Sequence, residues 1–149
     1  YFENFGKRVI KSPKYYFTEV GLLCFLLGIR EPDQITRDPL VGQIFENLVV
    51  IECLKGRYNA GRPADLYFFR DSKGNEVDLV MQTARKLTVI EIKSAATFRM
   101  KHLQGLRRIK SIAPNAGSGY LIYNGAHRTL SDGFTALHYR ECLQIEEEK

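Results

Sequence analysis

Two neighbouring runs, NEVDLVM at residues 75–81 and LTVIEIKS at residues 87–94, decide the fold of this chain. In each run polar and apolar side chains alternate, which is typical of a half-buried β-strand. Successive side chains of a strand point to opposite faces, so Glu91 and Lys93, two residues apart, project from the same face. The short polar segment between the runs predicts an antiparallel hairpin.

The register of this hairpin follows from the side chains that would face one another. Pairing Asp78 with Glu91 leaves residues 83–86 as a four-residue loop. The further pairs are Val80 with Val89 and Gln82 with Leu87. Directly opposed side chains have Cβ atoms about 4.5 to 5.5 Å apart, close enough for one divalent cation to bridge two carboxylates. Without a positive charge between them, the two carboxylates would repel.

Two interpretations of these charges compete. The first is an ordinary solvated strand pair with a cross-strand ion pair, which is the commoner arrangement for an isolated hairpin. The second is an interior strand pair, because apolar residues are predicted on both faces. They are Val77, Leu79 and Met81 on one side, and Val80, Leu87 and Val89 on the side of the acids. We favour the interior pair. Charged side chains are unusual in a covered sheet, so these residues are candidates for a functional site.

A third acid lies within an apolar helical pattern, DPLVGQIFENLVVIECLKGR at residues 38–57. Asp38 is the predicted N-cap and Pro39 the first helical residue. Glu46 projects from a face otherwise suited to packing, because valines follow it at i+3 and i+4. Buried carboxylates are rare unless they are paired or bind a metal. The alternative is that Glu46 lies at a helix edge or caps a neighbouring loop.

The order of a helical glutamate, a strand aspartate and a following Glu-x-Lys strand resembles the PD-(D/E)xK nuclease-like superfamily, which includes restriction endonucleases and Holliday-junction resolvases. From about Lys7 to about Tyr123, the chain also resembles the C-terminal domain of unknown function of many bacterial and archaeal AAA-type ATPases. The runs that carry this resemblance are KSPKYYFTEVGLLCFLLGI, PLVGQIFENLVVIECLK, LYFFRDSKGNEVDLVM and IEIKSAATF. Val77-Asp78 stands in place of the PD dipeptide, and Glu19 stands where related domains have Asp.

The resemblance implies a restriction-endonuclease-like α/β core, with a central mixed sheet that contains an antiparallel meander and is flanked by helices. It implies the catalytic set Glu46, Asp78, Glu91 and Lys93. Asp78, Glu91 and the backbone carbonyl of Ile92 would hold Mg²⁺ or Mn²⁺, cations that prefer oxygen ligands. Lys93 would orient or deprotonate the attacking water at a DNA phosphodiester.

Three functions of different class remain open. The first is a metal-dependent nuclease domain, and the second is a catalytically inactive module that binds DNA or a protein partner. The third is an interaction or oligomerisation domain of a parent ATPase. No G-x-x-x-x-G-K-[ST] motif occurs in the sequence, so ATP would bind only an absent N-terminal domain of that parent.

A second amphipathic helix, predicted at residues 98–112, is the candidate nucleic-acid element. Its packing stripe is Met100, Leu103, Leu106 and Ile109. Its other face carries Lys101, Gln104 and Arg108, which would contact DNA, although a solvated helix face fits the same pattern. The chain has 22 Lys and Arg against 17 Asp and Glu, a net charge of +5 that favours a polyanionic partner.

The length of 149 residues predicts one nuclease-like domain at residues 31–149 after an N-terminal appendage at residues 1–30 that resembles the end of a winged-helix segment. The chain starts without Met, and we expect it to be a C-terminal fragment. Cys24, Cys53 and Cys142 are widely spaced and predict reduced thiols in a cytoplasmic protein. No apolar run reaches the roughly 20 residues of a membrane span, so no membrane partner is expected.

The remaining elements follow from periodicity and from turn residues. Helices are predicted at residues 18–28 and 39–56, and a basic hairpin-like segment at residues 1–17. Strands are predicted at residues 65–70, 76–82, 87–93 and 119–123, with a weaker strand at residues 136–139. This order is that of an α/β domain.

Overall fold

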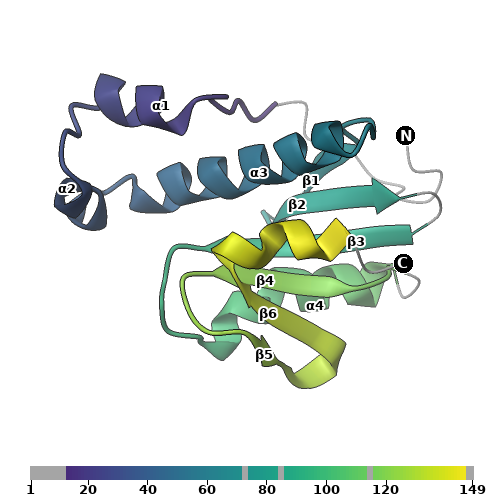
Figure 1. The fold of residues 1–149 in the computed structure, drawn as a ribbon. Coiled ribbons are helices and arrows are strands. Elements are labelled where there is room, and N and C mark those ends of the chain that lie inside the picture. The colour runs from purple at the N-terminus through teal and green to yellow at the C-terminus, as the bar shows by residue number, and fades with distance from the viewer. Residues whose placement is uncertain (1–12, 72–73, 84–85, 114–115, 147–149) are drawn as a thin grey trace.

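The structure is a computed structural model that describes residues 13–71, 74–83, 86–113 and 116–146, and it forms a mixed α/β fold around one open six-stranded sheet (Figure 1). The strands are β1 (Leu66–Arg70), β2 (Glu76–Thr83), β3 (Lys86–Lys93), β4 (Gly119–Tyr123), β5 (Arg128–Thr129) and β6 (Phe134–His138). The α-helices are α1 (Val20–Leu26), α2 (Pro32–Arg37), α3 (Val41–Asn59) and α4 (Gln104–Ile112). The 3-10 helices of the described residues are η1 (Met100–Leu103), η2 (Ser131–Gly133) and η3 (Tyr139–Glu146).

The sheet joins an antiparallel meander to a parallel part, in the order β1-β2-β3-β4-β6-β5. β1, β2 and β3 pair antiparallel, β3-β4 and β4-β6 pair parallel, and β5 runs antiparallel to β6. The central mixed sheet with a meander, as predicted, is therefore confirmed. Because β3, β4 and β6 are parallel, their carboxyl ends share one edge, and the antiparallel strand β2 starts at that edge.

Helices cover both faces of the sheet, so the fold has three layers (Figure 1). On one face, α3 and η3 pack through Val49, Val50 and Cys142 against strand residues that include Ile90 and Ile122. On the other face, Leu103 at the end of η1 and the α4 residues Leu106 and Ile109 meet another set that includes Val80, Val89 and Leu121. Covered strands explain why the runs at residues 75–81 and 87–94 are apolar on both faces.

The hairpin between β2 and β3 has the predicted register but a shorter connection. Val80 pairs with Val89 and Gln82 pairs with Leu87, as expected. Pairing continues to Thr83 and Lys86, so the predicted four-residue loop was too long. At the other end the ladder runs to Leu79–Ile90, one step short of the predicted Asp78–Glu91 pair.

A bulge in β2 overturns the predicted position of Val77. β1 pairs Tyr67 with Val80 but Phe69 with Val77, so β2 has an extra residue between these pairs. Because successive strand residues alternate between the two faces of the sheet, one extra residue moves every residue before it to the opposite face. Val77 therefore lies in the cluster of Val80 beneath α4, not on the face of Leu79 and Met81 as predicted.

Two of the predicted helices differ from the observed ones. α3 begins at Val41 with Leu40 as N-cap, so Asp38 and Pro39 precede the helix, and the Asp38 carboxylate accepts a hydrogen bond from the Leu40 N–H at 2.8 Å. The predicted helix at residues 98–112 is instead η1 followed by α4. The break leaves Met100 51% exposed, so it is not part of the packing stripe.

Elements at both ends of the chain were missed by the sequence patterns. α2, β5 and η3 are too short or too polar to show a periodic signal, and α1 is shorter than the predicted helix at residues 18–28. The basic hairpin-like segment predicted at residues 1–17 lies largely outside the described residues, and the division at residue 30 stays a prediction. Among the described residues, no helix is long and apolar enough to cross a membrane.

Candidate functional site

The Lys93 ammonium lies among three oxygen atoms at the carboxyl edge of β3. Its Nζ is 2.6 Å from Glu91 Oε1 and 3.1 Å from Asp78 Oδ2, and it donates a hydrogen bond to the Ile92 carbonyl at 2.9 Å. Those oxygens belong to the three residues assigned above to a metal ion. The ammonium therefore occupies the position in which a small cation would find the same donors.

The bulge in β2 explains how Asp78 reaches this position. Its Oδ2 accepts the backbone N–H of Ile92 at 2.8 Å, beyond the last paired residues of the β2–β3 ladder. The side chain thus takes the place of a strand partner for Ile92. Bulges commonly redirect a side chain beside a functional site, and here the redirected carboxylate also contacts Lys93.

Glu91 is a buried acid whose pKa differs strongly from its ordinary value. Its residue exposure is 8%, and its Oε2 is buried there without a hydrogen-bond partner. Burial and then the Asp78 charge raise the pKa of Glu91 to about 7, although Lys93 acts in the opposite direction. Buried orphan oxygens are rare in folded proteins. Within the described residues, this oxygen therefore lacks the donor that a buried carboxylate usually has.

Helix α4 approaches Glu91 closely because residue 105 is glycine. A Cβ at Gly105 would lie 2.6 Å from Glu91 Oε2 and 2.7 Å from the Glu76 carbonyl oxygen. The first turn of α4 is therefore one wall of the site. Burial lowers the pKa of Lys93, but the charges of Glu91 and Asp78 raise it overall, so the ammonium stays protonated.

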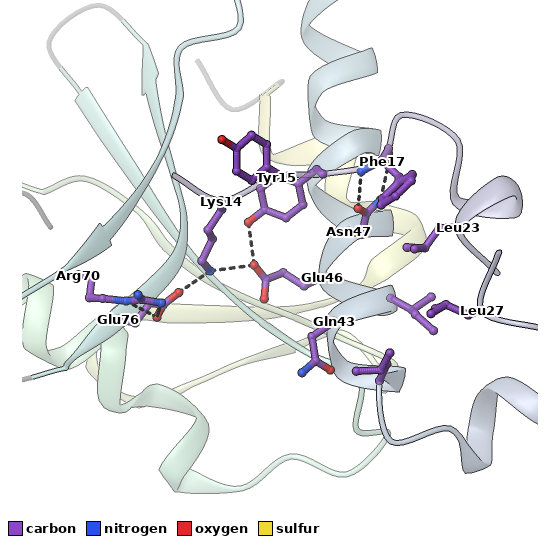
Figure 2. A pocket seen from close by; sticks show the side chains of 13 residues that line it. Lys14, Tyr15, Phe17, Leu23, Leu27, Gln43, Glu46, Asn47, Arg70 and Glu76 are labelled. Atoms are coloured by element: carbon purple, nitrogen blue, oxygen red, sulfur yellow. Dashed lines mark hydrogen bonds and ion pairs between the residues drawn. The ribbon is translucent and has the colours of Figure 1, made fainter. Parts of the chain in front are cut away.

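Glu46 lies on α3 and belongs to a second polar group (Figure 2). Its Oε1 accepts hydrogen bonds from Lys14 Nζ at 2.9 Å and from the Tyr16 hydroxyl at 2.7 Å. Lys14 also forms an ion pair with Glu76, whose other oxygen binds Arg70 at 2.6 Å. The bonds described for Glu46 are thus to Lys14 and Tyr16, and not to Asp78, Glu91 or Lys93.

Tyr16 links the two polar groups electrostatically. Burial raises the pKa of the Tyr16 phenol above its ordinary value, as do the bond to Glu46 and the charges of Glu46, Asp78 and Glu76. The hydroxyl therefore lies within the field of acids from both α3 and β2. Its segment lines a pocket of about 460 Å³, together with Glu46, Glu76, Leu23 of α1 and Leu27, the C-cap of α1 (Figure 2).

The sequence patterns missed the residues that hold Glu46. Lys14 and Tyr16 precede the first helix and have no motif spacing with Glu46. A weak signal existed for Asn47, which is a polar residue in an apolar helical stretch and is only 4% exposed. Glu76 shares the quoted strand run with Asp78, so its acidic character was visible without its partners.

The three predicted nucleic-acid residues are exposed near this edge. Lys101 lies on η1, and Gln104 and Arg108 lie on α4. Arg108 is 3.7 Å from Asp71. His102, between the first two, is buried, and its Nδ1 accepts the Arg99 N–H at 3.3 Å. Burial, followed by the charges of Lys93, Lys101 and Arg99, lowers the pKa of His102, which keeps the imidazole neutral.

The donor set of Asp78, Glu91 and the Ile92 carbonyl has only part of what a divalent cation requires. Within the described ranges, no group of three or more His, Cys, Asp and Glu side chains is arranged to hold a metal ion. Two carboxylates and one carbonyl are nevertheless hard oxygen donors of the kind that Mg²⁺ and Mn²⁺ take while keeping several waters. The buried Glu91 Oε2 without a partner agrees with such a ligand.

The geometry thus defines a mixed α/β domain whose open sheet carries a carboxylate–lysine cluster at the carboxyl edge of its parallel strands. Residues 41–142 match the family described as "Domain of unknown function (DUF4143)", and the chain belongs to this family.

Two curated relatives are uncharacterized proteins of Mycobacterium bovis (Mb2031c) and Mycobacterium tuberculosis (Rv2008c). Each is 31% identical to the chain over 144 residues, which cover 96% of the chain and 31% of the relative. The chain therefore spans about one third of the length of these relatives.

Proposed function

We propose that the cluster of Asp78, Glu91 and Lys93 binds Mg²⁺ or Mn²⁺ and hydrolyses phosphodiester bonds of DNA, on a core of the restriction-endonuclease-like type. One observation carries this proposal. The Lys93 ammonium contacts Asp78, Glu91 and the Ile92 carbonyl together, while a buried Glu91 oxygen has no partner in the described structure. Such a set of oxygens already surrounds one cationic group, which supports a role in binding a divalent cation.

We infer a chemical role for each residue of the cluster from its contacts. Asp78 and Glu91 would hold the cation, which when bound supplies Lewis acidity at a phosphoryl oxygen. The raised pKa of Lys93 keeps it charged, which favours a role in orienting water and offsetting phosphate charge over a role as base. Glu46 would complete the acidic surroundings through water.

We infer the partners from the surface beside the cluster. Lys101, Gln104 and Arg108 would bind DNA phosphates next to the first turn of α4, which packs on Glu91. We further propose that the domain acts within a longer ATPase, in line with its coverage of only 31% of its relatives. ATP would then bind outside this chain.

The test is cleavage of plasmid DNA with Mg²⁺, Mn²⁺ or EDTA. We expect metal-dependent nicking that Asp78→Ala abolishes and Lys93→Ala lowers by roughly 10²- to 10³-fold. Lys86→Ala is the matched control, because Lys86 is the exposed first residue of the same strand. Cleavage at the wild-type rate by Lys93→Ala would refute the assignment.

A catalytically inactive binding module is the second candidate. It is favoured by the way lysines already neutralise the acids, since Lys93 bridges Asp78 and Glu91 while Lys14 bridges Glu46 and Glu76. In that case wild type binds DNA with strong salt dependence and cleaves it with neither metal. A chain that neither binds nor cuts would instead favour protein contacts, for which α1 exposes Leu22, Phe25 and Leu26.

A further inference from the structure

The segment before α1 lies along α3 and reaches Glu46 with two donors (Figure 2). Lys14 Nζ and the Tyr16 hydroxyl bind the same oxygen, Oε1, at 2.9 and 2.7 Å. Figure 2 shows both dashed lines ending on that one atom. Two donors on one oxygen restrict the carboxylate of Glu46 to orientations in which Oε1 meets both of them.

Asn47 fixes the backbone that carries Tyr16. Its Oδ1 accepts the Phe17 N–H at 2.8 Å, and its Nδ2 donates to the Phe17 carbonyl at 2.8 Å. Asn47, which makes both bonds, is buried and is the residue next to Glu46. Glu46 and Asn47 therefore lie in the same turn of α3. The bonds of Asn47 to Phe17 hold the neighbouring Tyr16 beside Glu46.

We propose that Tyr16 is a positioning residue for Glu46, which anchors Oε1 and leaves Oε2 to accept a hydrogen bond from a water of the proposed cation site. This inference rests on the proposed function. It assigns a site role to the segment before α1, which the sequence patterns treated as an appendage. Lys14 binds the same oxygen, but it also binds Glu76 and contributes charge, so Tyr16 is the cleaner probe.

The experiment compares Tyr16→Phe with Tyr15→Phe. Both remove one phenolic hydroxyl from neighbouring residues, but Tyr15 is 88% exposed whereas the Tyr16 hydroxyl binds Glu46. The dissociation constant of Mn²⁺ is measured by electron paramagnetic resonance without DNA, and kcat and KM are measured with plasmid. Thermal unfolding first establishes that all variants are folded at the assay temperature.

We expect Tyr16→Phe to weaken Mn²⁺ binding by roughly 10-fold, as loss of a group that orients a metal-site residue commonly does. kcat should fall with KM for DNA nearly unchanged, and Tyr15→Phe should behave as wild type. In a Glu46→Gln background, Tyr16→Phe should have no further effect. A purely structural role would lower stability in both backgrounds without this dependence.

Two outcomes separate failure of this inference from failure of the proposed function. If wild type binds Mn²⁺ and Tyr16→Phe binds it equally well, the positioning role is refuted while the metal site stands. If wild type binds no Mn²⁺, the proposed function fails and the positioning role is refuted with it.

Discussion

Glu91 is buried beside Asp78 and Lys93, and this position makes the stability of the protein depend on pH. The pKa of Glu91 rises from 4.5 to about 7 on folding, so the folded state binds a proton more tightly than the unfolded state. Its contribution to stability is therefore complete below about pH 4.5 and is lost as the pH rises through 7. The loss is on the order of 3 kcal/mol.

Glu91→Gln tests this dependence because it preserves shape and removes the ionisation. Urea unfolding in EDTA should show that wild type loses more stability than Glu91→Gln between pH 4.5 and 8. Parallel curves for the two proteins would show that Glu91 ionises normally in the folded state.

Asp78 combines an acceptor for a buried backbone N–H with a negative charge next to Glu91. Asp78→Asn keeps an acceptor for Ile92 and removes like-charge repulsion, so its free energy of unfolding should stay within about 1 kcal/mol of wild type or rise. Asp78→Ala leaves the Ile92 N–H without a partner and should cost about 1–3 kcal/mol. Urea unfolding at pH 8 measures both, and equal losses would show that the ion pair with Lys93 dominates.

At the scale of elements, the contact of α4 with the sheet depends on the absence of a side chain at Gly105. Gly105→Ala improves helix propensity by up to about 1 kcal/mol. Its Cβ would nevertheless overlap Glu91 Oε2 and the Glu76 carbonyl oxygen. Overpacking of this kind typically lowers the free energy of unfolding by about 1–3 kcal/mol. We therefore expect a net loss of stability and displacement of α4.

Gly42→Ala is the control, because Gly42 lies in α3 and a Cβ there would meet nothing within 4 Å. Thermal unfolding should show a higher melting temperature for Gly42→Ala and a lower one for Gly105→Ala. A stabilised Gly105→Ala would mean that α4 can shift away from Glu91 at little cost.

At the scale of the whole molecule, the net charge of +5 favours binding of a polyanion. Individual cations contribute most where they lie on the binding surface. Lys101→Ala with Arg108→Ala should lower DNA affinity and reduce the slope of log affinity against log salt by about two at most. Cleavage at saturating DNA should persist, because both residues lie outside the Asp78–Glu91–Lys93 cluster.

The matched control is Lys55→Ala with Lys86→Ala, which removes the same charge. Lys55 lies on α3 and Lys86 at the start of β3, the end of the sheet opposite to Lys93. Fluorescence anisotropy over a salt series compares the two double variants. Equal changes in slope would show that net charge matters and the position of the cations does not.

The local pattern of apolar and polar residues was enough to predict the main strands and helices of this chain. Alternation fixed β2 and β3, their register at Val80–Val89, and the common face of Glu91 and Lys93, because a strand has a period of two that needs no distant partner. Apolar spacing likewise located most of α3 and the stripe of Leu106 and Ile109 on α4. These features depend on local geometry alone.

Only the tertiary structure decided the rest. The bulge that turns Asp78 towards Ile92 depends on pairing with β1, and the place of β6 between β4 and β5 depends on packing of the whole sheet. The bonds of Lys14 and Tyr16 to Glu46 join residues 32 and 30 positions apart. Sequence spacing is silent on such contacts, because their geometry is set by how α3 and the preceding segment pack together.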